Sequence, residues 1–414
     1  MRSNYKRIGD YIEQVKVKNK EGLYSKLLGI NIDKFFMPSV ANTVGVNLNN
    51  YKIVKKGQFA CNRMHVGRDY RIPIAISDKE IPFLVSPAYD VFQIKKEDDL
   101  LPEYLMMWFR RKEYDRNAWF HTDADVRGGL AWEAFCDLKL PIPSIEIQRE
   151  IVKEYNTVTN RIKLNENLNQ KLEETAQALY KYWFVDFEFP TEEGQSYKSS
   201  GGEMVYNEEL DKEIPAEWEV ITFSDFGEVV TGKTPSSNCP EDFGEEISFV
   251  TPGDFKNFKK FTLGTERYLS NEGAKKLKNK ILPKGSVIVT CIGSAMGKIV
   301  VAENDCITNQ QMNSIKVKHS FYTDFLYHHL IEVADEIKSI ALGSSTMPMI
   351  NKTDFEKIST LKPKDNLLVK YEYFSKKINE LTINHSKEIQ QLESLKSLLL
   401  AKMAKLGERE MVEE

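Results

Sequence analysis

Long apolar runs are missing from this chain of 414 residues. None approaches the ~18 consecutive apolar residues that a membrane-spanning helix needs, so we expect no membrane segment. The opening residues, MRSNYKRIGD, contain no apolar stretch of the kind that a secretory signal peptide carries. The contents of 41% apolar and 29% charged residues are ordinary for a soluble globular protein, and the scattered cysteines favour the cytoplasm.

Cysteine is scarce and irregularly placed. The five cysteines are Cys61, Cys136, Cys239, Cys291 and Cys306, and no two of them form a CxxC pair. We therefore expect reduced thiols, without a disulfide framework or a zinc site. The six histidines also lack the spacing of metal ligands, so we predict no metal site.

Catalytic motifs are also missing. Residues 227–234 fit the phosphate-binding pattern GxxxxGK[ST], but Pro235 and two serines follow where that loop needs a helix to begin. We find no cofactor loop with an Asn/Asp-Pro-Pro-aromatic site for methyl transfer to DNA. We also find no clustered carboxylates of a nuclease and no nucleophile–base pair. We predict that the chain is non-catalytic by itself.

The chain does contain two long heptad patterns, in residues 144–187 and 364–410. Apolar residues recur there at steps of three and four, as in a coiled-coil seam. No proline or glycine interrupts the first pattern between Pro143 and Pro190. The seam and partner-binding candidates are Ile151, Tyr155, Ile162, Leu172, Leu179, Phe374, Ile378, Leu392 and Leu399.

The two patterns align, since Leu392 follows Leu172 by 220 residues in a matching Gln-Lys/Gln-Leu-Glu context. The globular parts before them also match in outline, because Lys56-Gly57 and Lys284-Gly285 each precede a predicted strand. We therefore predict a duplication, with the two long helices pairing antiparallel as a rod of roughly 60 Å. The alternative is that each helix pairs with another protein.

The predicted fold is α+β, an internal repeat of two domains of mixed β-sheet with small helices. Its five segments are a first domain at 1–143, a long helix at 144–187, a linker or surface hairpin at 188–213, a second domain at 214–363 and a second long helix at 364–410. Helical spacing further predicts helices at 101–116, with a basic outer face, and at 323–337. The alternative for the tryptophan and arginines of 101–116 is nucleic-acid binding, since aromatic rings can stack on bases.

Polar loops between the predicted strands are the candidate binding surface. The net charge of −4 argues against a nucleic-acid ligand, but phosphate is bound by a local basic face. Arginine, lysine, glutamine and serine side chains hydrogen-bond base edges and phosphates. The DNA-binding candidates are Arg63, His65, Arg68, Arg71, Lys233, Thr234, Ser236, Ser294, Lys298, Gln310, Gln311 and Ser345.

Several short motifs resemble those of the specificity subunits of type I restriction–modification systems. In the second half these are Ile214-Pro215 with Trp218, then Gly232-Lys-Thr-Pro, Gly293-x-x-x-Gly297-Lys and Asn309-Gln-Gln. Pro141-Ile-Pro-Ser, followed by Gln148-Arg-Glu-Ile, resembles the start of the family's central helix. The first half departs from the pattern, because it has residues 62–71 in place of the Gly-x-x-x-Gly-Lys loop.

The resemblance implies two target-recognition domains, each reading half of a split, asymmetric sequence in double-stranded DNA. It implies two methyltransferase subunits, which bind S-adenosylmethionine and methylate adenine, and up to two restriction subunits, which use ATP and Mg. This chain would bind no cofactor. Two alternatives remain: a specificity subunit of a methylation-only bacterial system, and a duplicated coiled-coil scaffold that binds proteins without reading DNA.

Overall fold

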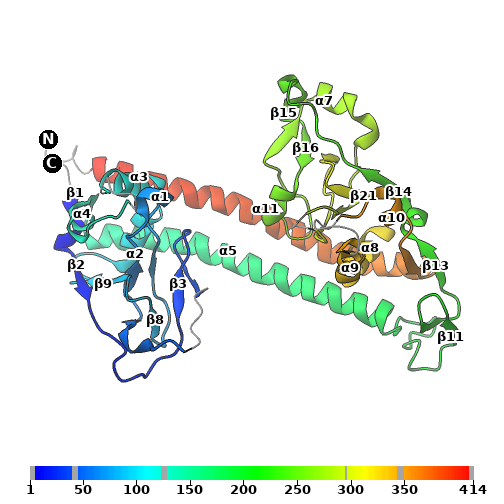
Figure 1. The fold of residues 1–414 in the computed structure, drawn as a ribbon, viewed down its shortest axis with the longest axis horizontal. Helices are drawn as coiled ribbons and strands as arrows, with labels where there is room; N and C mark the ends of the chain where they lie inside the picture. The colour runs from blue at the N-terminus through cyan, green and yellow to red at the C-terminus, as the bar shows by residue number, and fades with distance from the viewer. Residues whose placement is uncertain (1–4, 40–44, 123–127, 294–295, 343–348, 410–414) are drawn as a thin grey trace. The chain divides into compact units, whose positions relative to one another are not determined.

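The computed structural model describes residues 5–39, 45–122, 128–293, 296–342 and 349–409. It divides into two compact units. The first contains Met1–Lys163 with Gln390–Glu414, and the second contains Leu164–Ile389. Each long helix therefore contributes one end to each unit (Figure 1).

The two long helices are α5, Ile145–Tyr180, and α11, Asp365–Arg409. The backbone N–H of Gln148 donates to the Ser144 carbonyl (3.0 Å), which starts α5 directly after Pro143. A π-helical turn, η3 (Lys181–Val185), extends its far end. The expected pair of long helices is confirmed.

Within the second unit, α5 and α11 run antiparallel. Asn169 Nδ2 donates to Ser386 Oγ (3.1 Å), whereas the Trp183 ring lies 5.8 Å from that of Tyr371. As the residue numbers rise along α5, the residues that face them on α11 have falling numbers. In the first unit, Tyr155 of α5 is buried in one cluster with Met403 of α11. The expected pairing within the chain is confirmed in each unit.

The seam candidates differ in burial. Tyr155 and Ile162 are buried, and Phe374 is exposed on one side although its ring lies 6.0 Å from that of Trp183. The other candidates are half-buried: Ile151, Leu172, Leu179, Ile378, Leu392 and Leu399. Part of the apolar surface of the helices is therefore uncovered.

The first unit contains an antiparallel four-stranded sheet. Its strand order is β2 (Ile12–Val15), β9 (Asp90–Ile94), β6 (Phe59–Cys61), β7 (Ile74–Ile76). A separate antiparallel pair, β1 (Tyr5–Arg7) and β10 (Lys139–Pro141), leads into α5.

The second unit repeats this arrangement. Its antiparallel sheet has the order β14 (Gly227–Thr231), β21 (Met312–Val317), β18 (Val287–Thr290), β19 (Ile299–Val301). The pair β13 (Glu219–Thr222) and β22 (Ser359–Lys362) leads into α11.

Local markers of the duplication occupy equivalent places. Gly57 and Gly285 have φ of 78° and 86° and turn the chain into β6 and β18, where a side chain would be strained. Phe135 on α4 (Trp132–Asp137) and Phe355 on α10 (Lys352–Glu356) are both fully buried just before the strand that leads to a long helix. The predicted internal repeat is confirmed.

The copies differ outside this shared sheet. The first adds short antiparallel pairs: β3 (Leu28–Ile30) with β4 (Phe36–Pro38), and β5 (Lys52–Val54) with β8 (Phe83–Val85). The second adds a four-stranded sheet, β15 (Phe243–Gly244), β17 (Arg267–Leu269), β16 (Ile247–Val250), β20 (Cys306–Thr308), and helix α7 (Asn271–Lys276).

Both predicted short helices are divided in two. Residues 101–116 form parts of α2 (Pro102–Phe109) and α3 (Lys112–Phe120), and residues 323–337 form parts of α8 (Tyr322–Glu332) and α9 (Ala334–Leu342). α2 is nearly all buried and carries no basic residue, and the exposed basic residues of the predicted segment, Arg110, Lys112 and Arg116, follow it. Arg111, extended between α2 and α3, is buried with its guanidinium 4.4 Å from the Trp108 ring.

A buried charge pair joins the second domain to α11. Lys260 Nζ lies 2.7 Å from Asp324 Oδ1 on α8, and both side chains are almost inaccessible. Asp324 also accepts hydrogen bonds from Ser375 Oγ and Asn379 Nδ2 of α11. Burial alone would raise the pKa of Asp324, but Lys260 and these donors outweigh it and hold the pKa at about 2.

Two histidines on α8 lie beside this joint. Burial, helped by Lys260 and opposed by Asp324, lowers the pKa of His328 to about 3, and burial lowers that of His329 to about 4. The ring nitrogens of His329 contact the hydroxyls of Tyr180 and Thr360. Neither nitrogen of His328 has a hydrogen-bond partner among the described residues, and Glu173 is 4.0 Å away.

We predict that His328→Leu reduces the acid sensitivity of the second unit. The buried imidazole stays neutral in the folded state, whereas the same histidine in the unfolded state has a pKa near 6.5. The unfolded state therefore binds a proton first, and the free energy of unfolding falls as the pH drops from 6.5 towards 3. At pH 5 this loss is roughly 2 kcal/mol for one histidine. Thermal unfolding at pH 7 and pH 5 measures it.

The matched control is His329→Leu. It removes a similar titration but also breaks two hydrogen bonds, so we expect a loss of about 1–3 kcal/mol already at pH 7. Equal stability of the two variants at pH 7 would contradict the assigned difference between these neighbours.

Candidate nucleic-acid interface

The candidate residues of the second unit gather at one edge of its sheet. Antiparallel pairing aligns the ends of β14 and β18 with the starts of β21 and β19, as in the pairs Thr231 with Asn313 and Thr290 with Met312. The loops at 232–236, 291–298 and 309–311 therefore leave from the same edge. They carry Lys233, Thr234, Ser236, Lys298, Gln310 and Gln311.

Two of these loops are bonded to each other. Thr234 Oγ1 donates to Gln310 Oε1 (2.7 Å), and the Lys233 backbone N–H donates to the Thr308 carbonyl (2.9 Å). The approach requires glycine at 232, because a Cβ there would lie 2.2 Å from the Asn309 carbonyl oxygen. Gln310 is exposed, and its side-chain amide oxygen is held by Thr234.

The remaining candidates of this unit are less constrained. Asn309 Nδ2 donates to Gln311 Oε1 (3.2 Å), and Ser236 Oγ accepts from the backbone N–H of Asn238 (3.3 Å). Lys298 is exposed and lines a cavity of about 260 Å³ with Phe255 and Phe258. The candidates Ser294 and Ser345 lie outside the described residues.

The phosphate-loop pattern at 227–234 is a strand in the structure. Gly227–Thr231 form β14, which pairs along its length with β21. No helix follows Lys233, whose backbone is bonded to Thr308. The pattern therefore lacks the strand, loop and helix order of a nucleotide-binding loop.

The equivalent edge of the first unit carries the arginine-rich loop. β6 ends at Cys61 and β7 begins at Ile74, and between them the chain forms a short helix, α1 (Val66–Asp69). The backbone N–H of Gly67 donates to the Gly128 carbonyl (2.8 Å). Arg63, His65, Arg68 and Arg71 therefore occupy the edge that corresponds to Lys233 and Gln310.

Arg63 is tied into the protein. Its guanidinium lies 2.6 Å from Asp90 Oδ2, contacts the Leu130 carbonyl and lies 5.6 Å from the Trp132 ring. Asp90 also accepts from Gln14 Nε2 (2.8 Å). The side chains of Arg63 and Asp90 are only 17% and 13% exposed, so this arginine holds the base of the loop in place.

Arg68 and Arg71 face solvent. Arg68 makes two hydrogen bonds to Asp69 (2.7 and 3.1 Å), which hold the pKa of Asp69 below its usual range, and Arg71 Nη1 lies 2.9 Å from Asp33. Surface pairs of this kind are weak, so a phosphate can replace the carboxylate. His65 is half-buried at the N-terminus of α1.

A basic segment of the second unit is absent from the sequence candidates. Lys275 and Lys276 at the end of α7 pair with Glu272 and Asp242, whereas Lys278 and Lys280 have no acidic partner in the described part of the chain. The signal was visible as four lysines in the six residues 275–280. Such a cluster offers additional phosphate contacts.

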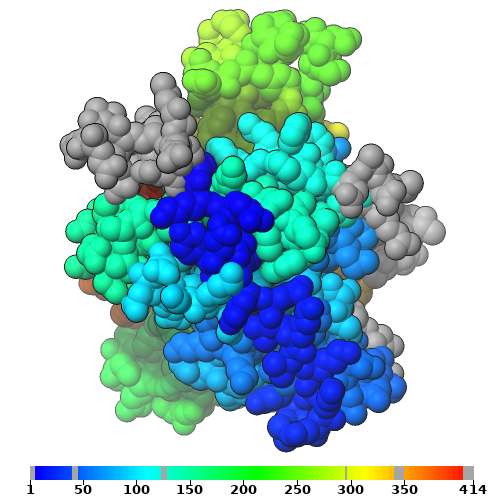
Figure 2. All heavy atoms as spheres, turned by 90° about the vertical axis from the view of Figure 1, so that its left-hand side faces the viewer, coloured from blue at the N-terminus to red at the C-terminus, as the bar shows by residue number. Residues whose placement is uncertain are grey.

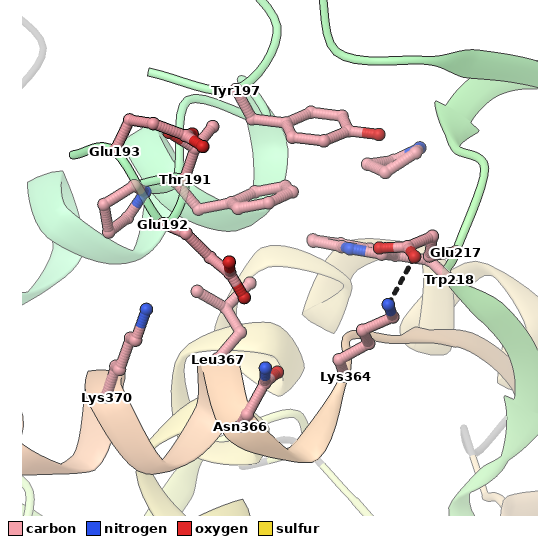
Figure 3. A pocket seen from close by; sticks show the side chains of 13 residues that line it. Thr191, Glu192, Glu193, Tyr197, Glu217, Trp218, Lys364, Asn366, Leu367 and Lys370 are labelled. Atoms are coloured by element: carbon pink, nitrogen blue, oxygen red, sulfur yellow. Dashed lines mark ion pairs between the residues drawn. The ribbon is translucent and has the colours of Figure 1, made fainter. Parts of the chain in front are cut away.

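Segment 188–213 contains a hairpin, as one of the two interpretations predicted. β11 (Met204–Asn207) pairs with β12 (Lys212–Pro215). Before it, the Phe189 ring stacks between Tyr197 (4.5 Å) and Trp218 (5.5 Å) beside a cavity of about 330 Å³ (Figure 3).

The walls of this cavity carry mixed charges. Lys364 pairs with Glu217, and Glu192, Glu193 and Lys370 line the opening (Figure 3). None of the DNA-binding candidates lines it. The aromatic stack joins the segment before the hairpin to Trp218, and Asn366, Leu367 and Lys370 of α11 line the same cavity.

Other chemistry finds little support in the described residues. They contain no group of three or more His, Cys, Asp or Glu side chains that could hold a metal ion, and none of their helices is long and apolar enough to cross a bilayer. Burial raises the pKa of Cys291 to about 11 and that of Cys306 to about 12, so these thiols remain protonated at neutral pH.

The sequence model of the type I restriction–modification DNA specificity domain matches residues 17–174 and 215–394. The chain belongs to this family. It is 25% identical over 455 aligned positions to the type I restriction enzyme HindI specificity subunit of Haemophilus influenzae, covering 96% of this chain and 97% of that one. It is 27% identical to the MjaIX specificity subunit of Methanocaldococcus jannaschii over 74% and 69% of the two chains.

The fold agrees with a solved specificity subunit. The crystal structure of the type I restriction–modification S subunit from M. genitalium matches with a TM-score of 0.59 at 13% identity, over 96% of this chain and 95% of the other. At that identity the likeness concerns the fold alone. The resemblance and the fold class predicted from the sequence are confirmed.

The two arginines of the first loop provide a test of the site. We predict that Arg63→Ala lowers the free energy of unfolding by about 2–3 kcal/mol, because it leaves Asp90 largely buried without its cation. Arg68→Ala should leave thermal stability unchanged and weaken DNA binding, with a smaller salt slope. Thermal unfolding and DNA titrations at several salt concentrations measure both. The reverse pattern would contradict these roles.

Proposed function

We propose that this chain reads a bipartite, asymmetric sequence in double-stranded DNA, one half with each unit. One observation carries the proposal: the same edge of the same four-stranded sheet bears polar loops in both copies, but with different residues. Arginines dominate the first edge, and Lys233, Thr234 and Gln310 lie on the second. Different donors and acceptors on one scaffold suit two different half-sites.

The long helices offer a surface for partners. In the second unit Leu164, Leu168, Phe374 and Leu381 are exposed, and in the first unit Leu395 and Leu398 are exposed. Apolar side chains in such number on a helix pair favour a further protein surface. We assign them to two methyltransferase subunits, in a cytoplasmic complex that also takes up to two restriction subunits.

In this assembly the chain carries no chemistry of its own. S-adenosylmethionine belongs to the methyltransferase partner, and ATP and Mg belong to the restriction partner. The exposed helix surface also suits the other two interpretations, a methylation-only system and a scaffold without DNA readout. Recognition of a defined DNA sequence separates the reader from the scaffold.

We predict that cells expressing this chain with its methyltransferase subunits methylate adenine in a single split motif, two short half-sites around a fixed gap. The reader selects the site and the partner modifies it. A methylome map, compared with cells that lack this chain alone, tests it. A purified complex that binds unrelated and genomic DNA equally, at every salt concentration, would establish the scaffold instead.

We further predict that one heptad inserted into α5, with a matching heptad in α11, lengthens the gap between half-sites. Seven helical residues add ~10 Å, about three base pairs of B-DNA. The methylome of the variant reports the new spacing. A heptad inserted into α5 alone is the control, because it breaks the pairing with α11 and should abolish methylation. An unchanged gap in the matched variant would sink the idea that the helices measure it.

A further inference from the structure

Three aromatic side chains form an exposed cluster on the first unit. We call Tyr70, Trp119 and Phe120 the aromatic patch; they are 62%, 40% and 80% exposed. The Tyr70 and Trp119 rings lie 5.3 Å apart, although one follows α1 and the other ends α3. Large aromatic side chains are normally among the more buried, so three exposed rings, two in contact and the third next in the chain, point to a ligand.

The patch is held by buried contacts beneath it. The Asp115 carboxylate on α3 pairs with the buried Lys34 (2.7 Å) and accepts from the backbone N–H of Ile72 (3.1 Å), two residues after Tyr70. Tyr114 and Ala118 anchor the same helix in the core. The two segments that carry the patch are therefore fixed to each other.

The backbone at Tyr70 is strained. Its φ of 55° lies in the left-handed region, which glycine adopts without cost and tyrosine does not. Strain at an exposed bulky residue is a frequent feature of binding sites. Here the strained residue, which lies between Arg68 and Arg71 in the sequence, exposes a large ring.

A cation lies on the same helix as two rings of the patch. Arg116 precedes Trp119 and Phe120 by three and four residues on α3, so the three share one helix face. Arg116 and Lys112 are exposed and have no ion-pair partner in the described part of the chain. The cyan spheres of the segment that contains α3 lie at the surface in Figure 2.

We propose that the aromatic patch contacts duplex DNA at the first half-site, stacking on bases or entering a base step, while Arg116 and Arg68 bind neighbouring phosphates. The inference rests on the proposed function and deepens it. Aromatic rings beside cations are suited to nucleic acid, because the rings meet base faces and the cations meet phosphates. The sequence preference at this half-site then also depends on how easily its base step unstacks.

The test uses the full chain in complex with its methyltransferase subunits. Duplexes carry the fluorescent base 2-aminopurine at successive positions of the first half-site. The wild-type complex should change the fluorescence strongly at one or two adjacent positions. Phe120→Ala and the double variant Trp119→Ala/Phe120→Ala should lose that change and bind cognate DNA about 10–100-fold more weakly.

Two controls accompany these variants. Tyr206→Ala removes an equally exposed aromatic ring of the second unit and should alter neither signal. Arg116→Ala should weaken cognate and unrelated DNA alike and reduce the salt slope by about one. Thermal unfolding and size-exclusion chromatography establish that each variant folds and assembles.

Three results would overturn the inference. Unchanged affinity and fluorescence in the double variant would place the patch outside the DNA interface. If the double variant loses its methyltransferase subunits, while the fraction that stays assembled binds DNA normally, the aromatic patch is a protein-docking surface. A wild-type complex without preference for the mapped site would refute the proposed function, and the inference with it. The behaviour of the wild-type complex therefore distinguishes failure of the proposed function from failure of the inference alone.

Discussion

Each globular domain shares one hydrophobic core with the ends of the long helices, and the rest of each unit depends on this. In the second unit the Phe184 ring of η3 lies 5.0 Å from Phe325 of α8 and 4.9 Å from Tyr371 of α11. In the first unit Tyr155 and Met403 belong to the cluster that contains Tyr104 of α2. The sheet cannot turn against its helices without opening this core, so the helix direction fixes where the polar edge of each sheet points.

The two copies meet this constraint with different chemistry. Tyr104 and Tyr155 precede Asp324 and Ser375 by 220 residues, so two buried tyrosines of one hydrophobic cluster in the first unit correspond to the Asp324 network in the second. A buried ion pair loses much of its attraction to desolvation and adds little net stability. Its value here is geometric, because Lys260 and Asn379 satisfy Asp324 in only one placement of the domain on α11.

The sequence predicted those features that depend on local spacing. Heptads without proline or glycine predicted α5 and α11, and Gly57 and Gly285 marked equivalent turns. It failed where side-chain packing decides, as at Arg111, whose extended backbone divides one predicted helix into two and whose buried guanidinium packs on the Trp108 ring. Strand pairing brings Arg63 to Asp90, with which it forms an ion pair, and Thr234 to Gln310, with which it forms a hydrogen bond. The spacing of residues in the sequence does not reveal such partners.

The net negative charge of the chain is compatible with DNA binding, because cations of the candidate loops are paired with acidic side chains. Arg68 and Arg71 are paired with Asp69 and Asp33 at the surface, and Lys276 is paired with Asp242. A phosphate that binds any of them replaces a carboxylate, so the net gain from each charge contact is smaller than it would be for an unpaired cation. In the proposed complex this weakens binding to unrelated DNA, where such contacts are the main attraction. Binding at the target is affected less, because base contacts and stacking add to the charge contacts there, so a protein with a net charge of −4 can still discriminate strongly between sequences.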